Sequence, residues 1–521
     1  MSSRRSPPAS AWAPRQHRPW PPPLPSDEPA LVLRGAPADR VEVAREDGAL
    51  ELRSRFDGEG VARVALPPGS YLVRAGFGAH FAPDAVAVDH PGAEVTVDPA
   101  PAATLTIAAS VEGDPAAPVR VTVERGGEEL ARFVALGETS RRLPPGELRV
   151  TVSHGLEHDV SIADLTLAAG EGARLEPDLP RVLDTSGWVS VDLHLHSDLS
   201  TDSVHAVEDA VRMLAAEGVD AAAATDHDFV TDYPAVAGRA GVGDRLLVVP
   251  GVEVSTTVFG HINGYPLVPD PDRAGAGAPV WFDRSPAEIF EALRALGDDS
   301  LGGALVQINH PRLGDASFFG SVGLDRETGR ATADPSTLGL PGETDLDDFG
   351  FEVLEVWNGY TRGGNEESFE DYLALWAAGR PFAMVGNSDS HRADRPPGSP
   401  RSFVAVADDA APSWSELSAG LRAGRVTVAA GVFVTAELAG PRAGDSVPLR
   451  VVVQAPPWAA TDRLRVYAGR VAVIDRAMGG AGAPLRLDEV IDVPLGGASF
   501  VVVRVDGDAA PSRCSTSPRW A

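Results

Sequence analysis

The chain has 521 residues, enough for three or four domains, and carries 45 basic against 74 acidic residues, a net charge of −29. This balance argues against binding to nucleic acid or to an anionic membrane surface, because both need clustered positive charge. Every basic residue is an arginine, which excludes P-loop, Schiff-base and Ser–Lys chemistry. The single cysteine, Cys514, excludes an internal disulfide framework and any multi-cysteine metal site.

The first residues, 1–27, are rich in proline and are expected to form a disordered tail. After Arg4 and Arg5 the chain continues with prolines instead of the apolar segment of a signal peptide. No run of 18 apolar residues occurs, so no transmembrane helix is expected. The sequence as it stands therefore predicts a cytoplasmic protein, or a secreted one if the true start lies elsewhere.

Two β-sandwich modules are expected next, over 28–100 and 101–182. Short alternating strands are separated by glycine and proline at regular intervals. A Leu-Pro-Pro-Gly turn at Leu66 is repeated at Leu143, about one module later. Neither module shows histidines or acids at ligand spacing, so we expect no site there.

Strands and helices alternate over 183–430, which predicts a mostly parallel sheet closed into a barrel. Short alternating strands return over 431–521 and predict a C-terminal β-domain. Ser285 and Ser413 each begin a capping-box sequence before an expected helix. In the barrel segment we expect strands over 190–196, 221–225, 246–254, 304–308, 353–356 and 382–385, and helices over 204–217, 286–296 and 367–378.

Histidines gather at the ends of the expected barrel strands. Period-two alternation places His194 and His196 on one face of the first strand. Seven of the 12 histidines lie in this segment, and six of the seven are at or just past the carboxyl end of a strand, where barrels build active sites. Imidazole mixed with carboxylate favours zinc, manganese or iron over calcium or magnesium.

The candidate ligands follow one another along the segment as His194-x-His196, Asp202, Thr225-Asp-His227, Glu253, His261, His310 and Asp389-x-His391. This ordered set resembles the motifs of the polymerase-and-histidinol-phosphatase (PHP) superfamily. With Gly260-His-Ile-Asn-Gly-Tyr, Glu355-Val-Trp-Asn and Gly386-Asn-Ser-Asp-Ser-His, the chain is similar, within that superfamily, to the carbaryl-hydrolase-like (CehA/McbA) family. The resemblance covers about residues 186–430. It implies a distorted (β/α)7 barrel flanked by N-terminal and C-terminal β-sandwich domains, holding two or three divalent metal ions (Zn, Mn or Fe).

The resemblance also implies a role for each residue of that set. The first metal would be held by His194, His196, Glu253 and Asp389. Glu253 would bridge to a second metal on His261 and His310, and Asp202, His227 and His391 would form the third site. Many relatives have histidine at the position of Asp202, so occupancy of the third site is left open. His205 is either a spare ligand or a histidine on the surface of the helix.

The function implied is a metal-dependent hydrolase that cleaves an ester, amide, carbamate or phosphoester bond of a small molecule. Glu253 and Asp389 would act at the metals, and Arg312 is either a clamp for an anionic group or a surface ion pair. The alternatives are a phosphoesterase acting on phosphomonoesters or nucleotides, a nuclease, and a non-catalytic binding protein with a metal-stabilised barrel. Because the only cations at the motifs are Arg312 and Arg392, a neutral carbonyl substrate is favoured over a phosphoester.

Other residues near these motifs are given supporting roles. Asp192 lies on the histidine face but deeper in the strand, so we expect it to orient a ligand histidine, and Asp226 to do the same. Trp357 and Asn358 either line the pocket or pack in the core.

Overall fold

The computed structural model describes residues 30–507, except for 38, 46–50, 78–79, 83, 93, 315, 360–361, 393 and 480–481. The proposed tail over 1–27 and Cys514 lie outside the described residues. The described chain divides into two compact units, the first comprising 30–103, 142–145 and 168–171 and the second the remainder. The domain boundaries given above remain predictions.

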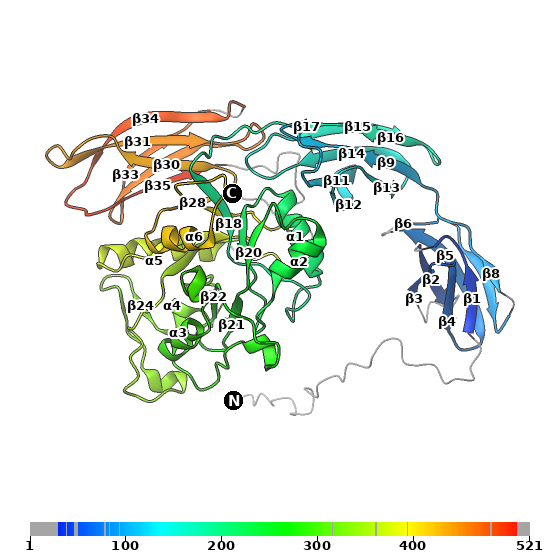
Figure 1. Cartoon of the computed structure of the whole chain (residues 1–521), viewed down its shortest axis with the longest axis horizontal. Coiled ribbons are helices and arrows are strands. Elements are labelled where there is room, and N and C mark those ends of the chain that lie inside the picture. The colour runs from blue at the N-terminus through cyan, green and yellow to red at the C-terminus, as the bar shows by residue number, and fades with distance from the viewer. Residues whose placement is uncertain are drawn as a thin grey trace, which may run out of the picture. The chain divides into compact units, whose positions relative to one another are not determined.

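The first unit contains two sheets that enclose a hydrophobic core (blue in Figure 1). Alternation in β5 buries Tyr71, Val73 and Ala75. One sheet has the order β4–β1–β8; in the other, β3, β2, β5 and β6 lie in a row and β7 also pairs with β5. The strands are β1 (Ala30–Arg34), β2 (Arg40–Arg45), β3 (Glu51–Arg55), β4 (Val61–Ala65), β5 (Gly69–Phe77), β6 (His80–Phe81), β7 (Val86–His90) and β8 (Val95–Thr96).

The second unit begins with more strands, of which β12, β11, β14 and β15 form one antiparallel sheet in that order. A buried ion pair joins Arg120 of β11 to Glu217, which directly follows the first helix of the central region, at 2.5 Å. The strands are β9 (Ala103–Ile107), β10 (Ser110–Val111), β11 (Val119–Arg125), β12 (Glu128–Ala135), β13 (Thr139–Leu143), β14 (Gly146–Ser153), β15 (Ser161–Leu167), β16 (Gly172–Leu175) and β17 (Asp178–Leu179).

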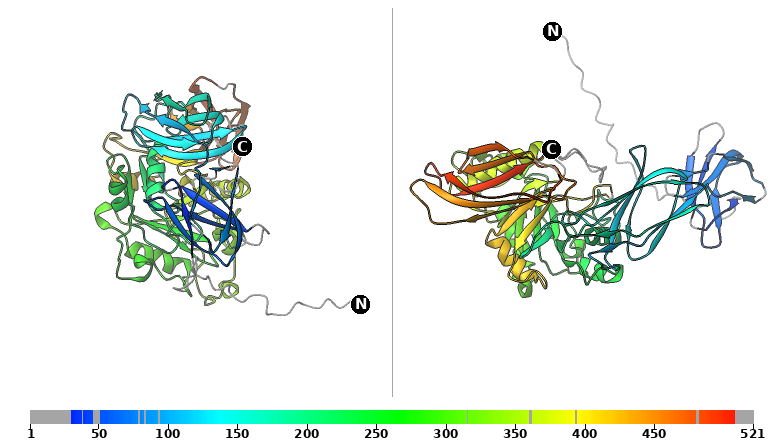
Figure 2. Two further views of the ribbon diagram at one scale, coloured as in Figure 1. Left: turned by 90° about the vertical axis from the view of Figure 1, so that its right-hand side faces the viewer. Right: turned by 90° about the horizontal axis from the view of Figure 1, so that it is seen from above.

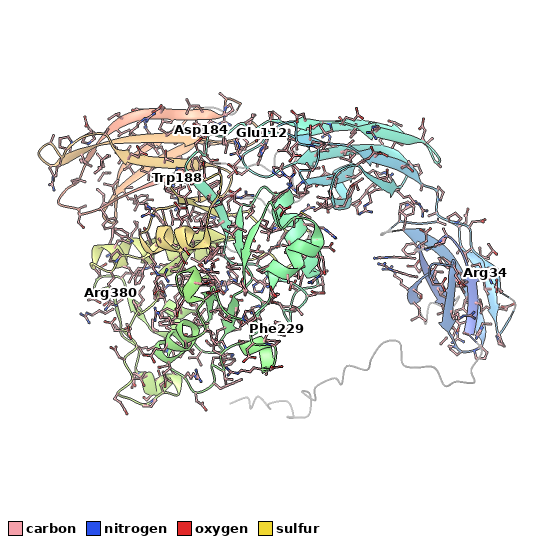
Figure 3. All side chains as sticks on the ribbon, viewed as in Figure 1. Arg34, Glu112, Asp184, Trp188, Phe229 and Arg380 are labelled. Atoms are coloured by element: carbon pink, nitrogen blue, oxygen red, sulfur yellow. The ribbon has the colours of Figure 1, made fainter. Side chains whose placement is uncertain are left out.

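The central region is built on two five-stranded sheets. The first has the order β20–β19–β18–β28–β29 and the second β21–β22–β23–β26–β27. Trp188, labelled in Figure 3, begins β18. The strands are β18 (Trp188–Asp192), β19 (Ala221–Ala223), β20 (Leu247–Val249), β28 (Arg401–Ala405) and β29 (Val426–Ala429), then β21 (Val252–Ser255), β22 (His261–Tyr265), β23 (Leu305–Ile308), β26 (Val353–Asn358) and β27 (Ala383–Asn387).

The expected (β/α)7 barrel is not seen. Two isolated parallel bridges, Leu195 with Ser390 and His227 with Glu253, join the two sheets, so each seam has one residue pair instead of a ladder. Strand β22 runs antiparallel to both β21 and β23. No helix lies between β20 and β21 or between β21 and β22, all of which are described. A five-residue connection such as 256–260 is too short for a crossover helix, so that pair must be a hairpin.

The helices expected from the sequence are present, but their ends differ. The expected helix over 204–217 begins later, at Val207, and α2 was not expected at all. Ser285 forms the complete capping box with Glu288, whereas the Glu416 carboxylate of the second box accepts from the Ala407 N–H instead. The helices are α1 (Val207–Ala216), α2 (Tyr233–Ala240), α3 (Pro286–Ala295), α4 (Phe318–Ser321), α5 (Arg362–Ala377), α6 (Trp414–Arg422) and the 3₁₀ turns Ala274–Gly277, Asp299–Leu301 and Pro335–Leu338.

The C-terminal strands, β30 to β35, form two three-stranded sheets around one core, as expected (orange and red in Figures 1 and 2). Their orders are β30–β31–β34 and β33–β32–β35. Among the described residues no helix is long and apolar enough to cross a membrane. The strands are β30 (Phe433–Leu438), β31 (Ser446–Gln454), β32 (Arg463–Ala468), β33 (Val471–Ala477), β34 (Leu485–Pro494) and β35 (Val501–Asp506); a small hairpin, β24 (Leu324–Asp325) with β25 (Arg330–Ala331), precedes α5.

Candidate metal centre

The nine side chains expected to bind metal come from loops and strand ends that meet at the seams between the two central sheets. Strand β18 ends at Asp192, so His194 and His196 follow the strand instead of lying within it, yet both are fully buried. His227 and Glu253 face each other across one seam, where their backbones form the isolated bridge. Phe229, labelled in Figure 3, marks the loop that follows His227.

Four groups of these residues could each hold a metal ion, because within each group the ligand atoms lie within 4.8 Å of one another. All nine predicted residues are members of at least one group. His194, His196, His227 and Glu253 each belong to two. The groups are His196–Asp202–His227–His391, His194–His196–Asp389, His194–Glu253–His310 and His227–Glu253–His261.

Glu253 is the centre of the arrangement and is completely buried. Its Oε1 lies 3.0 Å from His194 Nε2 and 3.2 Å from His261 Nδ1. Its Oε2 lies 2.9 Å from His227 Nδ1 and 3.4 Å from His196 Nε2. One carboxylate thus presents a different oxygen to two sets of imidazoles, which is the disposition of a bridging ligand.

The donor set fits metal ions better than it fits a closed network of hydrogen bonds. His196 Nε2 is 3.1 Å from Asp389 Oδ1, but neither that nitrogen nor Glu253 Oε2 has a hydrogen-bond partner among the described residues. Buried polar atoms ordinarily find a partner, and each exception needs an explanation. These two atoms lie 3.4 Å apart, and one cation could take both as ligands.

The buried carboxylates and imidazole rings of the centre shift one another's pKa values strongly. Burial alone would raise the pKa of Glu253, but His261, His194 and His227 hold it well below its usual range. Burial would lower the pKa of His194, but the carboxylates of Asp389, Glu253 and Glu355 raise it well above its usual value. Without metal, protons on the imidazole rings neutralise the buried carboxylates. A bound divalent ion would supply that positive charge instead.

Metal binding is therefore expected to release protons. Burial would lower the pKa of His227, but Glu253 and Asp202 raise it to about 10, so the metal-free protein keeps this ring protonated at pH 7. A ring that binds a metal must be neutral, so the proton leaves, and metal affinity should rise as pH rises towards 10. Calorimetric titration with zinc or manganese in buffers of different ionisation enthalpy measures the release. Binding with no net proton release would contradict this charge distribution.

Several residues that support the ligands were not recognised in the sequence. Glu355, in the middle of β26, accepts from His194 Nδ1 at 3.0 Å and from the His310 N–H at 2.7 Å. Asn309 donates to Glu253 Oε1 at 2.6 Å. With Nδ1 engaged by Glu355, His194 presents Nε2 to the centre.

Two serines bind other ligand rings in the same manner. Ser200 Oγ lies 2.9 Å from His196 Nδ1, and Ser255 Oγ lies 2.5 Å from His227 Nδ1. Asp226 accepts from Ser200, so it acts through the serine on His196. The expected role of Asp226 is thus met indirectly.

Among the described residues, six other than glycine have a positive φ, and three of the six lie at this centre. His310, Asp389 and the residue after His227, Asp228, have φ of 26°, 51° and 51°, in a region that side chains other than glycine rarely adopt. Asp389 is fixed there by its N–H, which donates to the His194 carbonyl at 2.8 Å. Such strain is retained where the surroundings fix it, commonly at functional sites.

Asp202 lies at the outer edge of the centre and His205 lies outside it. The side chain of Asp202 is half-exposed, with Oδ2 3.3 Å from His227 Nε2 and 3.1 Å from His391 Nε2. His205 is buried, precedes α1 instead of lying on its surface, and belongs to none of the four groups. The alternative of His205 as a spare ligand gains no geometric support.

Arg312 and Asp192 have other partners than those expected. The Arg312 guanidinium binds Asp371 through two hydrogen bonds, 2.6 and 3.0 Å long, so it forms an ion pair, but a largely buried one and not the surface pair expected. A clamp role for Arg312 stays a prediction. Asp192 accepts the backbone N–H groups of Ser388, Gly398 and His194, so its contact with a predicted ligand is to the backbone of His194 and not to the ring.

Trp357 and Asn358 were expected either to line the pocket or to pack in the core. Asn358 lies at the metal centre, where its amide donates to Asp389 Oδ2 at 3.1 Å. Trp357 is half-buried beneath a guanidinium group of β35.

No family model matches the chain, and no curated protein matches its sequence. Among solved structures, the chain is similar to a two-domain protein from Bacteroides vulgatus containing a predicted PHP-like metal-dependent phosphoesterase (17% identity, TM-score 0.35, 60% of this chain and 89% of that one). It is also similar to a putative metal-dependent phosphoesterase from Bifidobacterium adolescentis (15% identity, TM-score 0.25, 40% of this chain and 90% of that one). A third similarity is to a minor pilin of Streptococcus agalactiae (11% identity, TM-score 0.17, 30% and 98%).

Proposed function

We propose that this protein is a metal-dependent hydrolase of the PHP superfamily, and within it of the carbaryl-hydrolase-like family. The observation that carries the proposal is the convergence of nine predicted ligands into four overlapping groups around Glu253. Four groups that share ligands are more than one ion can use, which supports two or three divalent ions per chain.

The motifs imply a division of the ligands among three ions, and the geometric groups support part of it: Asp202, His227 and His391 share one group, whereas His310 is grouped with His194 and His261 with His227. His194, His196, Glu253 and Asp389 would hold the first ion, Glu253 with His261 and His310 the second, and Asp202, His227 and His391 the third. Ions bound there would bring the pKa of water towards neutrality and polarise a carbonyl or phosphoryl oxygen of the substrate.

The chain's own residues orient the ligands and exclude water. Glu355, Ser200 and Ser255 fix three ligand rings through their Nδ1 atoms. The amide groups of Asn309 and Asn358 hold Glu253 and Asp389 in their directions. Asp202 and His261 are the most exposed of the nine, so we place the substrate entrance on their side.

A neutral carbonyl compound is the substrate class we propose. Both arginines expected at the entrance have acidic partners: Arg312 is bound to Asp371, and Arg392 lies 3.4 Å from Asp394. A phosphomonoester arrives with nearly two negative charges and ordinarily meets several guanidinium or ammonium donors. The net charge of −29 further disfavours the approach of an anion.

The test compares kcat/KM of the metal-loaded protein for an aryl acetate, an aryl N-methylcarbamate and the matching aryl phosphate. We expect the better neutral substrate to exceed the phosphate by about tenfold or more, roughly 1.4 kcal/mol in transition-state binding. A tenfold preference for the phosphate, abolished in Arg312→Ala, would instead make the protein a phosphoesterase with Arg312 as its clamp. Metal binding without turnover of any of the three would favour the non-catalytic binding protein.

A further inference from the structure

Helix α5 carries two buried polar residues that reach towards the metal centre. Asn365, in its first turn, both donates to and accepts from the backbone of Asn358, at 2.9 Å in each direction. Asp371, two turns later, holds Arg312, two residues past His310. The position of α5 therefore bears on the segments that carry Asn358 and His310.

The C-terminal strands hold α5 from the other side. Arg504 of β35 binds Glu366 through two hydrogen bonds of 2.6 and 2.7 Å. Its guanidinium also lies over the rings of Trp357 and Phe369, 5.3 and 5.2 Å from their centres. The Arg504 side chain is only 14% exposed, so this end of the ion pair is shielded from solvent, whereas Glu366 is 45% exposed.

Apolar packing joins the same elements. Val502 of β35 belongs to one hydrophobic core with Phe369, Tyr372 and Leu373 of α5. Phe369 also makes an edge contact with Tyr467 of β32, at 5.3 Å between ring centres. The C-terminal strands and α5 thus share a core, which gives the guanidinium contact a firm support.

The contacts continue from α5 to a predicted metal ligand. Glu366 is adjacent to Asn365, Asn365 fixes the backbone of Asn358, and the Asn358 amide donates to Asp389 Oδ2 and to Glu355 Oε2, both at 3.1 Å. Asn358 is 1% exposed and Asn365 4% exposed. Side chains packed this closely cannot shift independently, so the loss of one contact displaces the neighbouring side chain.

We propose that the C-terminal strands position the metal centre: Arg504, through Glu366 and Asn365 of α5, fixes Asn358 against Asp389 and Glu355. This inference rests on the proposed function, since it takes Asp389 to be a metal ligand. The C-terminal strands would then contribute to metal affinity instead of being only an attached domain. Arg504 would be a positioning residue, with no contact to substrate.

The experiment measures metal affinity directly, by competition of zinc or manganese with a chromophoric chelator on the full-length protein. The variants are Arg504→Ala and Asn365→Ala, with Arg450→Ala as the matched control. Arg450 forms the same two-bond ion pair, with Asp488, at 2.8 and 2.8 Å, but within the C-terminal strands and away from α5. Residues that orient metal ligands typically contribute about 10- to 100-fold in metal affinity.

We expect Arg504→Ala and Asn365→Ala each to weaken the tightest metal site by about tenfold or more, and Arg450→Ala to leave it unchanged. Because both act through Asn358, the double variant should lose less than the product of the two single losses. If Arg504→Ala does not fold, by circular dichroism and thermal melting, Glu366→Gln breaks the same contact at the half-exposed end and takes its place.

Metal affinity equal to that of Arg450→Ala in both Arg504→Ala and Glu366→Gln would overturn the inference and leave the C-terminal strands as an attached domain. Full additivity of Arg504→Ala and Asn365→Ala would also overturn it, because the two would then act by separate routes. A wild-type protein that binds no metal would overturn the proposed function itself, so the two failures are distinguishable.

Discussion

Replacing Glu253 by Gln is expected to lower kcat/KM by about 10³-fold or more and to remove at least one bound metal ion. The carboxylate lies within 3.6 Å of five imidazole rings and is completely buried. Gln has nearly the same shape but no charge, so the ligands lose the anion that two ions would share. Loss of one preorganised electrostatic group in an active site commonly costs 10²- to 10³-fold, and here the metals are affected as well.

The matched control for this variant is His205→Ala. His205 is also buried and lies near Asp202 in sequence, but it belongs to none of the four ligand groups. Its removal is expected to change kcat/KM by less than about threefold, under 1 kcal/mol. Steady-state kinetics and elemental analysis on both folded variants provide the comparison. Equal losses for Glu253→Gln and His205→Ala would mean that the centre is misassigned.

Replacing Glu355 by Gln is expected to weaken metal binding by about 10- to 100-fold, a smaller effect that acts through His194. Glu355 accepts from His194 Nδ1, the His310 N–H, Asn358 and Asn387, so the neutral amide would place an N–H where only acceptors fit. A buried donor left without a partner adds about 1–3 kcal/mol of instability.

The measurement for Glu355→Gln is metal affinity by competition with a chelator, read beside the thermal midpoint. Glu489→Gln is the control, because Glu489 lies on a C-terminal strand with its side chain 42% exposed and paired with Arg476. A Glu355→Gln protein that melts earlier but binds metal like Glu489→Gln would show that Glu355 supports the fold alone.

The residues of the candidate centre could be picked out from the sequence because metal chemistry restricts the types of ligand residue so narrowly. Several histidines placed at strand ends indicate a shared site, which one histidine cannot do. Each of the nine predicted ligands belongs to at least one of the four groups. Glu355 lies in a motif that carries the family resemblance, but its role was not predicted, because one glutamate within a strand is ordinarily a residue of its solvent face. Nothing in Val-Leu-Glu-Val shows that both faces are covered. Only the tertiary structure brings His194 to it.

The prediction of a regular barrel was wrong because it assumed a helix after every strand, including segments where no helix separates the strands. The sequence over 252–265 holds two short strands around five residues ending in Gly260, a hairpin pattern, and Gly260 has φ of 65°. Helix α2 also had its signals, since the Asp232 side chain caps it and a proline stands in its first turn. The hairpin and the helix thus each had a local sequence signal that the prediction did not use.

The contacts of Arg504 lay beyond prediction for a different reason. Arg504 and Glu366 are separated by 138 residues. No periodicity or motif relates such positions, and the sequence offers many other acids to a single arginine.

Counting the metal ions tests the central claim most directly. The full-length protein, freed of metal by a chelator, is dialysed against excess zinc or manganese, cleared of loosely bound ions and measured by elemental analysis. The account predicts at least two ions per chain, falling in Glu253→Gln, because four ligand groups, two of which contain Glu253, exceed what one ion can use. One ion or none per folded chain would contradict it.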